Sequence, residues 1–102
     1  MLIVQGTVRV RAEDVERVRA AVSWYAPTTR AEEGCIHYAL AHDMLDPTLL
    51  HVIERWVDEA AFDAHVASAH VKRVNEFMSK IGPLELNLRS YIAHDENLMA
   101  GG

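Results

Sequence analysis

Residues 35–56 read CIHYALAHDMLDPTLLHVIERW and predict two strands joined by a short turn. Apolar and polar side chains alternate over 35–42 and again over 49–56, which is the period of a half-covered strand. The Asp and Pro residues between the two runs favour a turn. Because so short a connection cannot cross over a sheet, the two strands must pair antiparallel. This hairpin is the centre of the predicted fold.

The chain before the hairpin predicts one strand and one helix. Residues 2–10 alternate as a strand does. Over residues 12–32 apolar side chains recur every three or four positions, which indicates a helix with one apolar side. We expect Pro27 to kink or break this helix, because proline lacks the backbone N–H of a helical hydrogen bond. Gly34 is expected to end it.

The chain after the hairpin predicts two helical segments and a last strand. Asp58 can cap the first segment and Ser68 the second, because their side-chain oxygens accept from free N–H groups of the first turn. The sequence KIGP at 80–83 is a typical helix end. Residues 84–93 alternate as a fourth strand.

The predicted order is therefore β-α-β-β-α-β, an α+β ferredoxin-like fold with a four-stranded antiparallel sheet. Residues 1–94 are expected to form this single domain and residues 95–102 a loose tail. The face under the helices is predicted to carry Val4, Val8, Ile36, Tyr38, Leu40, Leu50, Val52, Glu54, Trp56, Leu86 and Leu88. The other face is predicted to carry Ile3, Thr7, Cys35, His37, Ala39, Ile53, Arg55, Asn87 and Tyr91. A half-apolar face of this kind is usually covered by a second copy of the chain, so we expect a homodimer.

Composition excludes several classes of partner. The 102 residues carry a formal net charge of −5 and no cluster of Lys and Arg, which argues against nucleic acid as a ligand. No apolar run approaches the roughly 20 residues of a membrane span, and the first residues do not resemble a signal peptide. Cys35 is the only cysteine, so no disulfide forms within the chain and a reducing cytoplasm is the expected location.

Glu54 is the first candidate for chemistry, because the strand pattern places it beside Trp56 on the face under the helices. A buried carboxylate either raises its pKa and serves as a general base, or is held by a donor in a structural role. Trp56 has two interpretations as well: a core residue, or a flat wall for an aromatic ligand. Tyr38, on the neighbouring strand, could add a phenol to that wall.

His65 and His70 raise the question of a metal. They are five positions apart, whereas two ligands on one helical face are three or four apart, so we expect no metal site. If His65 faces inward, it could carry a proton at neutral pH. The alternative is a core histidine with a satisfied hydrogen bond.

Three segments resemble the antibiotic biosynthesis monooxygenase family: TRAEEGCIHYAL at 29–40, Asp46-Pro47, and ERWVDEAAFDAHVASAH at 54–70. The resemblance implies a dimeric α/β barrel with a pocket between sheet and helices in each subunit. It also implies oxidation of a small aromatic or quinol-like substrate by O2 without cofactor or metal. Gln5 stands where haem-degrading members have an asparagine, which argues against haem.

Within that resemblance, His65 and Glu54 are the candidate catalytic bases. The candidate substrate-binding residues are Trp56, Tyr38, Phe62, His70 and Phe77. Two other functions stay open: an isomerase or tautomerase that uses the same base on an acidic C–H, and a dimeric binding module without catalysis.

Overall fold

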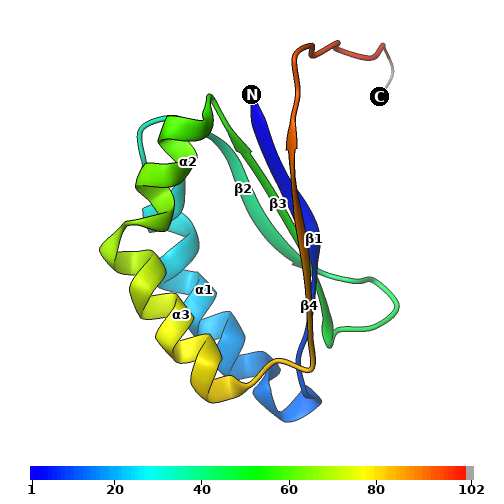
Figure 1. Cartoon of the computed structure of the whole chain (residues 1–102). Coiled ribbons are helices and arrows are strands. Elements are labelled where there is room, and N and C mark those ends of the chain that lie inside the picture. Colours follow the sequence, from blue (N-terminus) through cyan, green and yellow to red (C-terminus); the bar gives the residue numbers. More distant parts are fainter. Residues whose placement is uncertain (101–102) are drawn as a thin grey trace.

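The computed structural model describes residues 1–100 and shows a four-stranded antiparallel sheet with helices on one face (Figure 1). The strands are β1 (Leu2–Arg9), β2 (Cys35–His42), β3 (Leu49–Trp56) and β4 (Glu85–Ile92), in the spatial order β2-β3-β1-β4. A short 3-10 turn η1 (Ala12–Asp14) leads into helix α1 (Val15–Arg30), and helices α2 (Glu59–Val66) and α3 (Ala69–Ile81) follow β3. This arrangement confirms the predicted α+β ferredoxin-like βαββαβ fold.

The predicted hairpin forms the part of the sheet on which the site is built. Strands β2 and β3 pair antiparallel, with Tyr38 opposite Glu54. The side chain of Asp46 accepts hydrogen bonds from the backbone N–H of Thr48 at 3.0 Å and from its hydroxyl at 2.6 Å. These bonds hold the turn closed, as short polar side chains do in tight connections.

The predicted helix caps are also present. Asp58 accepts a hydrogen bond from the N–H of Ala61, and Ser68 accepts one from the N–H of Val71. Gly82 ends α3 in the left-handed region, at φ 66°. Only two residues, Ala67 and Ser68, separate α2 from α3, and α3 takes a different direction from α2 after this break.

Helix α1 is not broken at Pro27, where the sequence predicted a kink or a break. The helix continues through Pro27 and ends at Arg30, before Gly34. Both Pro27 and Ser23, whose carbonyl loses its helical partner, are exposed to solvent. Water can bond the freed carbonyl there, so the cost of proline in the last turns of the helix is reduced.

The predicted positions of Cys35 and Ile36 are wrong. A β-bulge lies between Cys35 and His37, and it puts Cys35 directly opposite Trp56. Cys35 therefore packs against the core under the helices, whereas Ile36 is exposed. An extra residue in one strand shifts the alternation by one position, and a pattern of apolar residues does not reveal where this happens.

Strand β4 lies outside the cover of the helices. All eight of its residues are exposed. Leu86 and Leu88 lie on the predicted face, Leu86 directly opposite Val8, but the helices do not cover them. The residues from Ala93 to Ala100 form no further helix or strand, and the last two residues of the expected tail, 95–102, lie outside the described part. In residues 1–100, no helix has the length and apolar character that crossing a bilayer requires.

Candidate functional site

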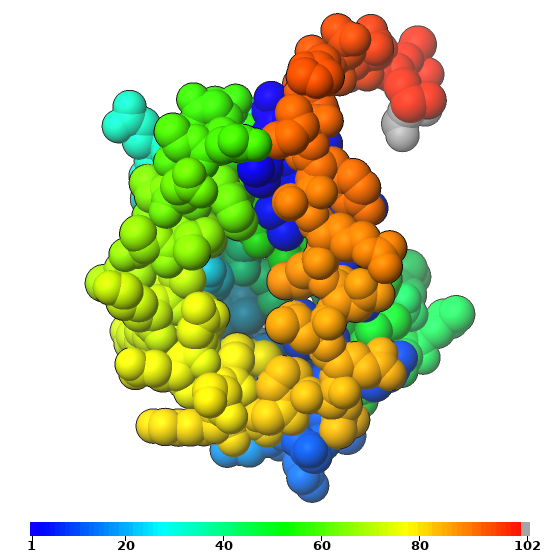
Figure 2. All heavy atoms as spheres, in the orientation of Figure 1, coloured from blue at the N-terminus to red at the C-terminus, as the bar shows by residue number. Residues whose placement is uncertain are grey.

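A cavity of about 220 Å³ lies between the helices and the sheet. Figure 2 shows its mouth as a hollow between α3 and the uncovered strand β4. Its lining is largely apolar, and its polar members include Tyr25 of α1, Tyr38 of β2, Glu54 of β3 and Asn75 of α3. An apolar cavity with a few convergent polar groups is the usual form of a small-molecule site.

Glu54 is the acidic group in the cavity wall. Its position on β3, opposite Tyr38 of β2 and Val4 of β1, turns the carboxyl toward the helices. Burial raises the pKa of Glu54 above its usual range, and the hydrogen bond from Trp56 and the nearby imidazole of His65 oppose that rise only in part. A carboxyl with a raised pKa can take a proton from a substrate and return it.

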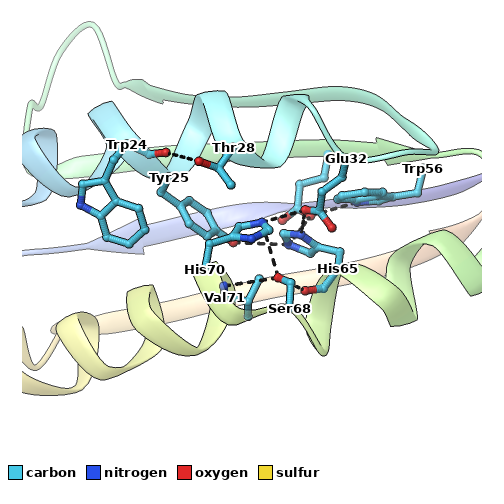
Figure 3. A network of polar contacts seen from close by, with 10 residues as sticks. Trp24, Tyr25, Thr28, Glu32, Trp56, His65, Ser68, His70 and Val71 are labelled. Carbon is cyan, nitrogen blue, oxygen red and sulfur yellow. Dashed lines mark hydrogen bonds and ion pairs between the residues drawn. The ribbon is translucent and has the colours of Figure 1, made fainter.

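His65 lies directly behind Glu54, on α2, and is buried. Its Nδ1 is 2.5 Å from Glu32 Oε2, and its Nε2 is 3.3 Å from the Tyr25 hydroxyl (Figure 3). The distance from Nε2 to Glu54 Oε1 is 3.9 Å. His65 is not part of the cavity lining itself, but it contacts two groups that are.

His70 joins the same cluster from the next helix. Its Nε2 is 2.9 Å from Glu32 Oε2, the oxygen that His65 also contacts. The two rings lie 5.7 Å apart between centroids. Ser68 caps α3 and donates its hydroxyl to the carbonyl of His65 at 2.6 Å, which fixes the change of direction between the helices. Residues five positions apart do not share one face of a single helix. His65 and His70 meet because they lie on two different helices, α2 and α3.

Glu32, His65 and His70 together offer three possible metal-ligand atoms within 4.8 Å of one another. Ligands at 2.0–2.1 Å from a tetrahedral zinc ion are separated from each other by roughly 3.3 Å. Here the Glu32 oxygen lies 2.5 and 2.9 Å from the two histidine nitrogens, which are hydrogen-bond distances. The arrangement is therefore that of a hydrogen-bonded cluster.

Of the site residues expected from the sequence, Glu54 and Tyr38 line the cavity. Trp56 is fully buried and packs with Phe62 in a core cluster on β1 and β3. Phe77 packs against a second core cluster. These three aromatic side chains are not in the cavity lining.

Sequence reasoning missed Tyr25 and Glu32. Tyr25 belongs to the apolar stripe of α1, where nothing separates it from an ordinary core residue. Glu32 lies in the turn after α1, where an acidic residue is most often solvated. Only the tertiary contact with two histidines from distant helices distinguishes it.

The chain is similar to proteins of one family over most of its length. The sequence model of a family described as antibiotic biosynthesis monooxygenase matches residues 1–76. "Probable quinol monooxygenase YgiN" of Escherichia coli (strain K12) is 31% identical, and the match covers 87% of this chain and 94% of that one. YcnE of Bacillus subtilis (strain 168), provisionally named a monooxygenase, is 30% identical over 69% of this chain and 74% of its own length. A Deinococcus radiodurans crystal structure, provisionally named an antibiotic biosynthesis monooxygenase, superposes with a TM-score of 0.91 at 26% identity, over 99% of this chain and 100% of that one.

Proposed function

Because the chain belongs to the antibiotic biosynthesis monooxygenase family, we propose that it oxidises a small aromatic, quinol-like molecule with O2 and without cofactor or metal. One observation carries the proposal: a buried carboxyl of raised pKa, Glu54, in the wall of a largely apolar cavity. The name of the Escherichia coli relative, a quinol monooxygenase, supports the substrate class.

The chemistry requires little beyond a dry pocket and a base. A phenol has an ordinary pKa of about 10 and reacts slowly with O2 in its neutral form. Once Glu54 removes the hydroxyl proton, the anion can pass one electron to O2 and recombine with the superoxide that forms. A quinol and O2 then give a hydroxyquinone and water, with one oxygen atom in each product. All four electrons come from the quinol, so no other reductant is needed.

The residues divide into groups that reach the cavity and groups that hold them. Glu54 contacts the substrate as its base, and Tyr38 and Tyr25 lie against its ring. His65 receives the proton behind Glu54. Trp56, Phe62 and Phe77 act indirectly, by packing under the cavity wall, and His70 acts through Glu32.

The same site would also serve an isomerase, because Glu54 and a tyrosine hydroxyl are placed to move a proton between carbon and oxygen. Consumption of oxygen separates the two activities. We expect purified protein treated with chelator to consume O2 with a dihydroxynaphthalene or an anthrone. The product should carry one labelled oxygen atom when the gas is ¹⁸O₂.

The matched variants are Glu54→Gln and Glu33→Gln. The first removes the base and should lower the rate by roughly 10²–10⁴-fold, whereas the second changes an exposed glutamate and should leave it unchanged. No oxygen uptake over a panel of quinols and anthrones, or uptake that needs added metal, would refute the proposal. Rearrangement of a substrate without uptake would support the isomerase.

A homodimer is part of the same proposal. Strand β4 is exposed over its whole length, and the sheet face opposite the helices exposes Ile53 and Tyr91. A second copy packed against that face would cover Ile53 and Tyr91. Light scattering should give twice the chain mass of 11.5 kDa. We also propose a cytoplasmic location, because the single cysteine, Cys35, needs no oxidising compartment.

A further inference from the structure

We propose that Glu32, His65 and His70 form a proton exit path from the buried cavity to the surface, in which Glu32 sets the tautomer of His65. The inference rests on the proposed function in one respect: Glu54 is the group that takes the proton of the substrate. The tautomer of His65 depends on the three-residue cluster alone and is a property of the ligand-free protein.

Glu32 fixes which nitrogen of His65 carries hydrogen. An ionised carboxylate can only accept, so the contact of 2.5 Å with Glu32 Oε2 requires the proton on Nδ1 of His65. A neutral imidazole has one N–H, which leaves Nε2 as a free acceptor. That nitrogen faces the cavity wall, at 3.3 Å from the Tyr25 hydroxyl and 3.9 Å from Glu54 Oε1. Glu32 is thus a positioning residue that points the basic nitrogen at the cavity.

A path through the protein is needed because Glu54 is buried against the substrate. Once protonated, Glu54 must lose its proton before the next turnover, while the substrate or product fills the cavity. Tyr25 lines the cavity, and its hydroxyl contacts His65. Burial raises the pKa of Tyr25 to about 12, so it stays a neutral hydroxyl that can accept one proton while it donates another.

The outer end of the proposed path is more exposed than His65. The side chain of His65 is 5% exposed, whereas those of Glu32 and His70 are 17% and 15% exposed. The groups that face His65 are Tyr25 of α1, Glu32 of the following turn, Glu54 and Trp56 of β3, Phe62 of α2 and His70 of α3. Within residues 1–100, the carboxylate of Glu32 is the one anion in direct hydrogen-bond contact with the ring, so it stabilises the imidazolium that forms when Nε2 takes a proton.

The protons balance over one cycle. The substrate hydroxyl gives a proton to the Glu54 carboxylate, which passes it to Nε2 of His65 directly or through Tyr25. The imidazolium then releases its Nδ1 proton to Glu32, and Glu32 passes it to His70 or to water. The hydroxyquinone is an acidic enol and leaves as its anion, so a quinol and O2 give this anion, water and one proton, and the path delivers that proton to bulk water. When the cavity empties, Nε2 of His65 releases its proton to water there and Nδ1 regains one from Glu32, which returns every protein group to its starting state.

The first test uses ¹⁵N-labelled, ligand-free protein and long-range ¹H–¹⁵N correlation of the histidine rings. We expect His65 in the Nδ1–H form. Glu32→Gln keeps a carbonyl acceptor and should keep that form, whereas Glu32→Ala should lose it. Glu33→Ala, a change at the exposed neighbouring position, is the control and should behave as wild type. An Nε2–H tautomer in the wild type would overturn the inference. So would an Nδ1–H tautomer that persists in Glu32→Ala.

The second test measures turnover with the quinol that wild type oxidises. Glu32→Gln and His70→Gln should each slow turnover, by up to roughly 10²-fold, and their rates should rise with the concentration of added imidazole. The wild-type rate should not depend on imidazole. Slow variants that imidazole does not rescue would overturn the path. An absence of oxygen uptake in wild type would refute the proposed function and leave the tautomer result to decide the inference about Glu32.

Discussion

The indole N–H of Trp56 donates a hydrogen bond of 3.0 Å to Oε1 of Glu54, two positions earlier on the same strand. Residues two apart on a strand share a face, so both side chains lie under the helices. The indole is completely buried and the carboxyl nearly so. Trp56 therefore has two contributions: its ring packs in the core of this region, and its indole N–H holds the carboxyl of Glu54, the candidate base.

Replacing Trp56 by phenylalanine tests both contributions together. Trp56→Phe keeps an aromatic ring but removes the donor and part of the buried volume, which leaves a carboxylate oxygen without its partner. We expect the free energy of unfolding to fall by about 1–3 kcal/mol. Chemical denaturation at pH 7 measures it. Trp24→Phe is the control, because Trp24 is only partly buried and should lose less stability. A midpoint equal to that of wild type would contradict a core role for Trp56.

Gly6 permits the close approach of strands β1 and β4. A Cβ atom at this position would lie 1.9 Å from the carbonyl oxygen of Asn87, which belongs to the backbone and cannot rotate away. Gly6→Ala should therefore push β4 from β1 and lower the free energy of unfolding by about 1–3 kcal/mol. Thr7→Ala, on the same strand, adds no atom and should cost less. Thermal unfolding of the two variants compares them, and equal melting temperatures would contradict the steric argument.

Much of the fold could be predicted from local pattern. Strands 35–42 and 49–56 occur at the predicted residues, and Asp58 and Ser68 cap helices as expected. These features depend on residues near one another in sequence, so alternation and capping chemistry are sufficient. The bulge beside Cys35 was missed because it depends on how two strands fit together.

The candidate site was predictable only in part. Alternation placed Glu54 and Tyr38 correctly on the face under the helices, because Tyr38 lies after the bulge in β2 and Glu54 lies on β3, whose pairing with β1 is regular. The contact of His65 and His70 with Glu32 joins three separate elements, and no spacing in the sequence indicates it. The burial of Trp56 likewise depends on how α2 packs against β3, which was open from the sequence.

A charge on the uncovered sheet face should prevent the proposed dimer. Ile53 lies there with 44% of its surface exposed, and Ile53→Glu would place a carboxylate between two apolar faces. We expect light scattering to show the mass of a single chain, 11.5 kDa. Val66→Glu is the matched control, because Val66 is 50% exposed but lies on α2, away from the sheet face. A dimer in both variants would exclude this face as the interface.

The pH dependence of stability tests the raised pKa of Glu54. Burial is the main cause of the raised pKa, so the folded protein holds this proton to a higher pH than the unfolded chain does. Between the ordinary carboxyl pKa of 4.5 and the raised pKa, the folded state binds more protons than the unfolded state. The free energy of unfolding must then fall as the pH rises through this window, with a slope of up to about 1.4 kcal/mol per pH unit.

Glu54→Gln removes this dependence, because an amide does not titrate and its oxygen can still accept from Trp56. The stability of the variant relative to wild type should therefore be smallest below pH 4.5, increase with pH, and become constant above the raised pKa of Glu54. Urea denaturation of both proteins over this range gives the difference, in which the shared effects of His65 and Glu32 largely cancel. A difference that stays constant or decreases with pH would show that Glu54 is ionised in the folded protein at least as readily as in water, and would remove its role as a base tuned by burial.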